Sequence, residues 1–351
     1  MLTRLDHIPD GLLDCPPHEL FNIIPDATLI NLEGKKKEPL FLSVLLHGNE
    51  PTGLVVAQNI LKKYRDTGLP RSLILFIGNV RAASEGKRKL DGEPDFNRIW
   101  LENPVGDESE IHLSIVELLH DMARQPLFAS IDIHNNTGIN PHYACVNRLT
   151  MPFLNLAQMF ARTVLYFIRP SGVQSKAFAH LCPAVTLECG KVGDEFGIQR
   201  ATSFVDEVMT LDTLPESIVK DEDIDLFHTL AIIKVPESVS FSFDGSDADV
   251  QFIQGIDTLN FEEIPPGTIL ARVRTGLTTP LHVLDEDGSD ISGELFSINN
   301  GELVNNKTMM PSMLTLDEKV IRQDCLCYVM ERYEIGMGEK FTEDIKPVWT
   351  N

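Results

Sequence analysis

The sequence is poor in basic residues and has no long apolar run, and each shortage excludes a class of protein. Lys and Arg number 30 against 52 Asp and Glu, which gives a formal net charge of −22. Binding to a phosphate backbone or to anionic lipid needs clustered positive charge, so nucleic acid is not expected as a partner. No stretch approaches the roughly 20 apolar residues of a membrane span, and the first residues lack the apolar core of a secretion signal. We therefore expect a cytoplasmic protein without a membrane partner.

Cysteine is also scarce, with six residues scattered along the chain. This spacing does not fit a disulfide scaffold, and we expect buried free thiols. Cys325 and Cys327 resemble a metal-binding pair, but their one-residue spacing is more typical of two positions on one face of a strand.

The length and the order of apolar patterns predict two domains. At 351 residues the chain exceeds the roughly 250–300 residues beyond which one core usually splits. Up to about residue 220, short β-like runs alternate with helical patterns, which predicts an α/β domain with a mixed, largely parallel sheet flanked by helices. The expected strands span residues 40–46, 72–80, 129–135 and 184–189, and the expected helices span 51–66, 109–125, 151–167 and 195–211.

Residues 221–351 have a different texture. Short β-like pieces are broken by Gly, Asp, Asn and Pro, a pattern typical of strands joined by turns. The pieces span residues 230–243, 249–256, 268–274, 291–298 and 324–333. We expect this part to form a second, smaller β-rich domain.

The stretch "HGNE" ends the first expected strand and carries a candidate pair of metal ligands, His47 and Glu50. Gly48 and Asn49 favour a tight turn that lets the two side chains converge. A catalytic zinc ion usually has three protein ligands drawn from His, Glu, Asp and Cys. A solvated loop pair or a helix cap remains the alternative for this motif alone.

Two further strand ends carry polar residues of the same kind. His134 ends one strand and follows Asp132, which could hold its imidazole, although a core histidine bound to a carbonyl would look the same. Glu188 ends another strand and precedes Gly190, so it could act as a general base or lie in solvent. Ligands in α/β sheets bind where the carboxyl ends of strands meet, which favours the functional interpretation of both.

A basic stretch over residues 79–100 leads into Asn97 and Arg98. The planar fork of arginine binds a carboxylate through two hydrogen bonds. Arg98 lies between Phe96 and Ile99, which favours a pocket over an exposed basic loop.

Taken in order, the motifs H-x-x-E, N-x-x-A with D-x-N-R, D-x-H and T-x-E-x-G resemble the succinylglutamate desuccinylase/aspartoacylase family. This family belongs to the zinc carboxypeptidase superfamily. The resemblance spans residues 40–190, and residues 257–272 are similar to the second domain of the family.

The resemblance implies a role for each matching residue. One zinc ion per chain would bind His47, Glu50 and His134, and Glu188 would be the catalytic base and proton shuttle. Asn97 and Arg98 would bind the substrate carboxylate, and Arg88 would polarise the scissile carbonyl, although the segment after Arg88 is slightly longer than in the family pattern. Asp132 and Asn135 would support the third ligand. Arg169 lies in a region that does not align with the family pattern, and it is a separate candidate for binding a second substrate carboxylate.

The expected function is therefore zinc-dependent hydrolysis of the amide bond of an N-acyl amino acid. A zinc carboxypeptidase acting on peptides or related amides is one alternative, and a non-catalytic zinc- or ligand-binding homologue is another. The acyl group, the amino acid, a homo-oligomeric assembly and a divalent ion other than zinc are left open by the sequence.

Overall fold

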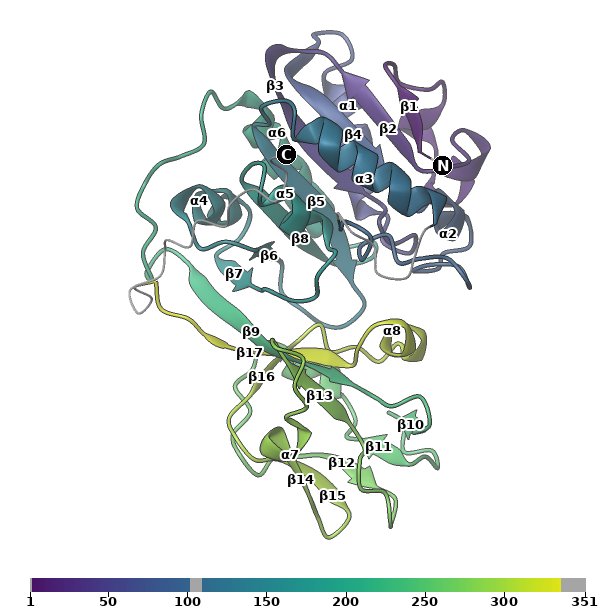
Figure 1. Cartoon of the computed structure of the whole chain (residues 1–351), viewed down its shortest axis with the longest axis vertical. Coiled ribbons are helices and arrows are strands. Elements are labelled where there is room, and N and C mark those ends of the chain that lie inside the picture. Colours follow the sequence, from purple (N-terminus) through teal and green to yellow (C-terminus); the bar gives the residue numbers. More distant parts are fainter. Residues whose placement is uncertain (1, 102–108, 336–351) are drawn as a thin grey trace. The chain divides into compact units, whose positions relative to one another are not determined.

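A computed structural model describes residues 2–101 and 109–335, which fold into two compact units. Of the described residues, one unit contains those up to Asn135, His142–Leu226, Glu334 and Ile335. The other contains Asn136–Pro141 and Phe227–Tyr333. Figure 1 labels the elements of both. None of the helices in the described part of the chain combines the length and the apolarity that a membrane crossing needs.

The first unit is built on a mixed sheet with the strand order β1-β2-β4-β3-β5-β8-β6-β7. Its central strands β4, β3 and β5 are parallel, whereas β2 runs antiparallel to β4 and β6 runs antiparallel to β8. The strands are β1 (Thr3–Leu5), β2 (Thr28–Leu32), β3 (Gly34–Val44), β4 (Leu69–Ile77), β5 (Ala129–Asn136), β6 (Tyr143–Val146), β7 (Thr163–Tyr166) and β8 (Ala184–Lys191).

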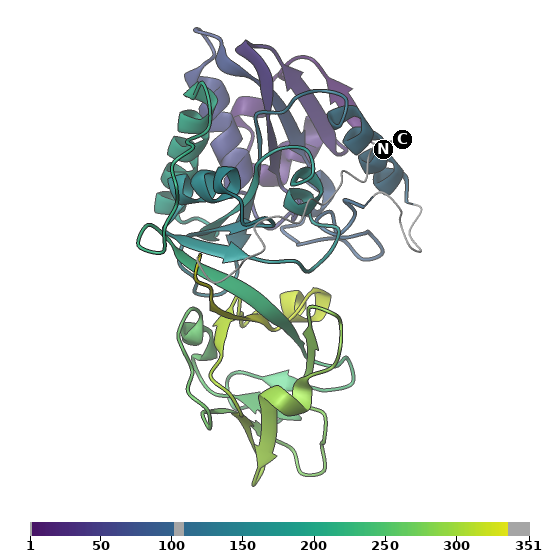
Figure 2. The same ribbon diagram turned by 60° about the vertical axis from the view of Figure 1, so that its left-hand side comes forward.

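Helices cover both faces of this sheet. They are α1 (Thr52–Lys63), α2 (Val80–Ser84), α3 (Glu110–Met122), α4 (Met151–Phe160), α5 (Gln174–Phe178) and α6 (Glu195–Thr210), with 3-10 turns at Leu12–Asp14 and Pro17–Asn22. Helices α1 and α6 lie on one face and α3 lies on the other, with the strands between them in both views (Figures 1 and 2). Lys63 and Tyr64 bond to Asp206, which ties the end of α1 to α6.

The sequence of β3 explains its central place. Residues 40–42 and 44 are apolar and fully buried, as a parallel strand covered on both faces requires. Val44 is in register with Ile77 of β4 and with Ile133 of β5. The carboxyl ends of these strands therefore lie side by side, and the loops that leave them start at the same edge of the sheet.

The second unit consists mainly of β-strands. One group contains β9 (Asp225–Lys234), β13 (His282–Asp285), β16 (Met310–Ser312) and β17 (Cys327–Arg332); the other is a sheet with the order β10-β11-β12-β15-β14. Its strands are β10 (Phe241–Ser242), β11 (Val250–Phe252), β12 (Ile269–Val273), β14 (Phe296–Asn299) and β15 (Glu302–Asn305). Short helices lie at Ile256–Leu259, at α7 (Ser292–Leu295) and at α8 (Glu318–Gln323). Val250, Ala271, Val283 and Leu303 are central members of its apolar core.

The predicted fold class is confirmed: a mixed, largely parallel sheet flanked by helices is accompanied by a smaller β-sheet. The predicted helix over 151–167 is wrong in its second half, because α4 ends at Phe160 and Thr163–Tyr166 form β7. Apolar β-branched and aromatic residues continue the run there, and periodicity alone does not separate a buried helix from a buried strand. The six cysteines are buried free thiols, as expected.

Arg71 of β4 is buried within the first unit, with 2% of its surface exposed. Its guanidinium donates to the carbonyl oxygens of Glu38 at 2.8 Å and Leu211 at 2.7 Å, and it lies 3.4 Å from the centre of the Phe128 ring. The carbonyl of Leu211 also accepts from Lys36 at 2.6 Å. Two cations therefore bind the carboxyl end of α6, where the helix dipole is negative.

We expect Arg71→Ala to lower the free energy of unfolding by roughly 2–4 kcal/mol, because it leaves buried carbonyls without donors and opens a cavity. Urea and thermal denaturation would measure the change. Arg65→Ala is the control, since Arg65 is exposed and its loss should change stability by less than about 0.5 kcal/mol. Equal effects of the two variants would contradict the structural role given to Arg71.

Candidate metal and catalytic site

The predicted ligands lie at the carboxyl edge formed by β3, β4 and β5. His47 follows β3, and His134 lies on β5 directly after Ile133, the register partner of Val44. Leu45 turns the chain out of β3 in a left-handed conformation with φ of 55°. This conformation is uncommon for a residue other than glycine, and strained backbone of this kind recurs at functional sites. The amide of Asn79 holds the turn by donating to the Leu45 carbonyl at 2.6 Å.

The loop that carries His47 and Glu50 is packed closely against α2. A Cβ atom on Gly48 would lie 2.2 Å from the backbone nitrogen of Ala83, so only glycine fits there. The amide of Gly48 donates to the carbonyl of Arg88, and the amide of Glu50 donates to the carbonyl of His47. These contacts close the tight turn that the sequence predicts, and α1 begins directly after it.

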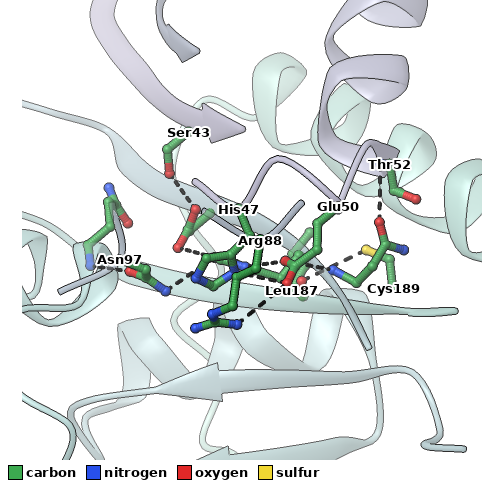
Figure 3. Close-up of polar contacts among 12 residues, drawn as sticks. Ser43, His47, Glu50, Thr52, Arg88, Asn97, Leu187 and Cys189 are labelled. Atoms are coloured by element: carbon green, nitrogen blue, oxygen red, sulfur yellow. Dashed lines mark hydrogen bonds and ion pairs between the residues drawn. The ribbon is translucent and has the colours of Figure 1, made fainter. Parts of the chain in front are cut away.

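Glu50 joins the two histidines through its two carboxylate oxygens. Nδ1 of His47 lies 2.9 Å from Oε1, and Nδ1 of His134 lies 2.7 Å from Oε2. All three side chains are buried, and one ligand atom from each lies within 4.8 Å of the others. Figure 3 shows the carboxylate of Glu50 turned toward His47. Two imidazole nitrogens and a carboxylate are a donor set that suits zinc, so these residues could hold a metal ion.

The outer nitrogen of each imidazole faces another carboxylate. Nε2 of His134 lies 2.8 Å from Asp132, whose other oxygen accepts from the hydroxyl of Ser43 at 2.6 Å. Nε2 of His47 lies 3.2 Å from Asp95. A carboxylate in this position keeps the proton on Nε2 and leaves the lone pair of Nδ1 for a metal ion. The arrangement therefore fits a divalent cation at the point where both Nδ1 atoms meet Glu50.

Close ion pairs shift the pKa values of these buried groups. Burial alone would raise the pKa of Glu50, but His47 and His134 outweigh it and hold that pKa well below its usual range. Burial opposes the charged form of His134, yet Asp132 and Glu50 raise its pKa well above the ordinary value. Glu50 is thus a carboxylate in the folded protein, the form in which it can bind a cation.

Glu188 lies on β8, the neighbour of β5, with its backbone paired to Tyr143 of β6. Its side chain is buried, and burial raises its pKa to about 8, whereas His134 works in the opposite direction. A carboxyl group whose pKa lies near neutrality can both accept and return a proton. The structure therefore places a group suited to acid–base chemistry on the strand beside the candidate ligands.

Arg88 reaches this site. Its guanidinium donates to Oδ2 of Asp95 at 3.0 Å through Nη2 and at 3.2 Å through Nε, and Nη1 lies 3.9 Å from Oε1 of Glu50. Only 9% of the side chain is exposed. Arg88 therefore brings a positive charge to the edge of the ligand group, as Figure 3 shows.

Asn97 lies beside His134, with Nδ2 3.3 Å from Nε2 of the imidazole. Its Oδ1 accepts from the backbone amide of Gln174 at 3.0 Å, which fixes the direction in which Nδ2 points. When Nε2 of His134 donates its proton to Asp132, it cannot accept from Asn97, so the Asn97 amide keeps a donor for another group. Arg98 is half-buried and donates to the Asn97 carbonyl at 2.8 Å.

The remaining predicted residues have different surroundings. Asn135 supports the site, because its backbone amide donates to Glu50 at 3.2 Å. Its side-chain oxygen accepts from the Thr52 backbone amide, and its side-chain nitrogen donates to the Gly190 carbonyl. Arg169 is exposed and lies next to a cis-proline. The sequence interpretation gave no role to Asp95, although the residue is the first position of the D-x-N-R motif, which was the available signal.

Comparison with known proteins identifies the family. The sequence profile of the succinylglutamate desuccinylase/aspartoacylase catalytic domain matches residues 37–211, the part of the chain that holds all of these side chains. The chain belongs to this family. No curated protein matches it by sequence.

Solved structures share the fold of the family at low sequence identity. The succinylglutamate desuccinylase of Chromobacterium violaceum is 17% identical, with a TM-score of 0.55, and the match covers 87% of this chain and 88% of that one. A succinylglutamate desuccinylase/aspartoacylase from Rhodobacter sphaeroides gives 15% identity, a TM-score of 0.56 and coverage of 86% and 88%. Murine aminoacylase 3 is 13% identical, with a TM-score of 0.54, and the match covers 86% of this chain and 96% of that one.

The raised pKa of Glu188 predicts how the stability of the metal-free protein depends on pH. The folded protein holds a proton up to about pH 8 that the unfolded chain releases near its ordinary pKa of about 4.3. The contribution of this group to stability is therefore complete below about pH 4 and is lost as the pH rises to about 8. Between these two pH values, the contribution of Glu188 to stability falls by about 1.4 kcal/mol for each pH unit.

We expect metal-free Glu188→Gln, which cannot ionise, to gain stability relative to the wild type as the pH rises from about 5 to about 8. Thermal denaturation at a series of pH values would measure the difference. Glu117→Gln, an exposed change on α3, is the control and should follow the wild type at every pH. If the difference in stability between Glu188→Gln and the wild type stays constant with pH, the raised pKa is not that of Glu188.

Proposed function

We propose that this protein is a zinc-dependent hydrolase that cleaves the amide bond of an N-acyl amino acid. The observation that carries the proposal is the convergence of His47, Glu50 and His134, with ligand atoms within 4.8 Å of one another. Membership in the succinylglutamate desuccinylase/aspartoacylase family supports the deacylase chemistry. One zinc ion per chain would bind these three residues.

Zinc and Glu188 would supply complementary chemistry. When bound, Zn²⁺ polarises a carbonyl group and brings the pKa of a water molecule close to neutral. The carboxylate of Glu188 accepts a proton from the water that attacks the acyl carbon. It returns this proton to the nitrogen of the amine as the C–N bond breaks, which leaves a carboxylic acid and a free amino acid. Burial raises the pKa of Glu188 to about 8 in the metal-free protein. A cation held by the three ligands would favour the charged form, the carboxylate that the first step needs.

The other residues orient the substrate and stabilise charge. Arg88 donates to the carbonyl oxygen as negative charge develops on it, a contribution of roughly 3 kcal/mol for one well-placed donor. Nδ2 of Asn97, fixed by the Gln174 amide, and the guanidinium of Arg98 bind the carboxylate of the amino acid. We assign this chemistry to a catalytic domain over residues 1–220 and treat residues 221–351 as an accessory β-rich domain.

An activity screen tests the proposal directly. Purified protein of known zinc content should hydrolyse at least some N-acetyl or N-succinyl amino acids, and a chelator should abolish this activity until zinc is added back. Short peptides with free carboxyl ends belong in the same screen. If the protein removes residues from the carboxyl ends of peptides and does not hydrolyse acyl amino acids, it is a carboxypeptidase. If it binds zinc and hydrolyses none of these compounds, it is a non-catalytic homologue.

Two substitutions should separate proton transfer from substrate binding. Glu188→Gln should lower kcat by roughly 10²–10⁴-fold with zinc still bound, because the amide cannot accept a proton. Arg98→Ala should mainly raise KM, by about tenfold or more, because it removes a charge-assisted contact. Arg98→Lys is the matched control and should rescue only part of the loss, since an ammonium lacks the planar fork. Normal turnover in Glu188→Gln would overturn its role as the base.

A further inference from the structure

Asp95 lies in the loop between α2 and α3 and touches three residues of the site. Its side chain is 11% exposed. Oδ1 lies 3.2 Å from Nε2 of His47 and accepts a hydrogen bond from the backbone amide of Asn97 at 2.8 Å. Oδ2 accepts from Nη2 and Nε of Arg88 at 3.0 and 3.2 Å. One carboxylate therefore connects a candidate metal ligand, a candidate catalytic arginine and the residue beside the third ligand.

The two oxygens have different tasks. The one facing His47 keeps a proton on Nε2, and this selects the tautomer whose Nδ1 lone pair faces Glu50. The other binds Arg88 through two donors and so fixes both the position and the plane of the guanidinium. Each task needs an acceptor, and a carboxylate offers one on both sides.

We propose that Asp95 is a positioning residue that couples the metal site to Arg88: it holds His47 in its metal-binding tautomer and holds Arg88 toward the reacting carbonyl. The second half of this statement rests on the proposed function. The first half concerns zinc binding alone and can be tested without a substrate.

The substitution of Asp95 by asparagine, which has the same shape, shows why the contacts with His47 and Arg88 both need a carboxylate. In Asp95→Asn, the single oxygen faces either Arg88 or His47. If it faces Arg88, the amide NH₂ opposes the proton on Nε2 of His47 and the amide proton of Asn97. If it faces His47, the NH₂ opposes the donors of Arg88. The substitution keeps the shape of the side chain, breaks one of the two contacts, and replaces the carboxylate in the other with a weaker, neutral acceptor. The support that His47 receives is therefore reduced in either orientation.

Zinc affinity, measured with zinc itself in competition with a chromophoric chelator, tests the contact with His47. We expect Asp95→Asn to bind zinc roughly 10–100-fold more weakly, the usual effect of losing the carboxylate behind a histidine ligand. Arg88→Met should not weaken zinc binding, because it removes a positive charge that lies 3.9 Å from Glu50. Asp132→Asn is the matched comparison, since Asp132 has the same relation to His134.

Kinetics at saturating zinc test the contact with Arg88. If Asp95 acts through Arg88, the double variant Asp95→Asn/Arg88→Met should lose no more kcat than Arg88→Met alone. In Asp132→Asn/Arg88→Met the two losses of kcat should multiply. The contacts of Asp132 are with His134 and Ser43, so the two substitutions act on different parts of the site. A residue with a merely structural role would give multiplying losses in both pairs.

Unchanged zinc affinity in Asp95→Asn, or losses that multiply with Arg88→Met, would overturn the proposal. If the wild-type protein hydrolyses no acyl amino acid, the proposed function fails, and the zinc titration still decides whether Asp95 holds His47. If Asp95→Asn does not fold, Asp95→Ser takes its place, because its small hydroxyl cannot satisfy Arg88 and His47 together. The same two measurements then apply.

Discussion

The candidate site depends on the common direction and register of β4, β3 and β5. Val44 pairs with both Ile77 and Ile133, so the residues that come after these three positions, among them His47, Asn79 and His134, lie at one edge of the sheet. Asp132 and His134 are two positions apart on β5 and therefore share a face of the sheet, which allows the carboxylate to bond to the imidazole. A slip of one residue in the pairing would turn both side chains to the opposite face. The site is thus a consequence of how the sheet is paired.

Charge balance explains why this edge suits a cation. Glu50, Asp95 and Asp132 bring three carboxylates into contact with two imidazoles. The guanidinium of Arg88 donates to Asp95, and Arg98 adds a second positive charge near the same carboxylate. Burial reduces the screening of these charges by water. With neutral imidazoles, the excess of negative charge favours a divalent ion at the point where both Nδ1 atoms converge. The strongly acidic composition of the chain excludes many partners but does not conflict with a cation site.

The fold class could be predicted because apolar runs mark buried strands, and the ends of these strands indicated that His47 and His134 lie at one edge. The grouping of both histidines with Glu50 as ligands was predicted from the resemblance to the family. Asp95 was overlooked because it lies in a loop, where no periodicity indicates which way a side chain points. The second half of the predicted helix at 151–167 is a strand, because an apolar run satisfies either structure and tertiary pairing decides. The roles assigned to Glu188, Arg88, Asn97 and Arg98 stay predictions, although the structure brings Arg88 and Asn97 into contact with the ligand group.

Gly48 has a consequence for recognising distant relatives. A methyl group at this position would collide with the backbone of Ala83, so the spacing of His47 and Glu50 is compatible with α2 only when the second residue of the motif is glycine. A search pattern written H-G-x-E would therefore select for the packed helix as well as for the ligands. A chain with a bulkier residue there would have to move the helix, and its histidine and glutamate would be weaker evidence of the same architecture.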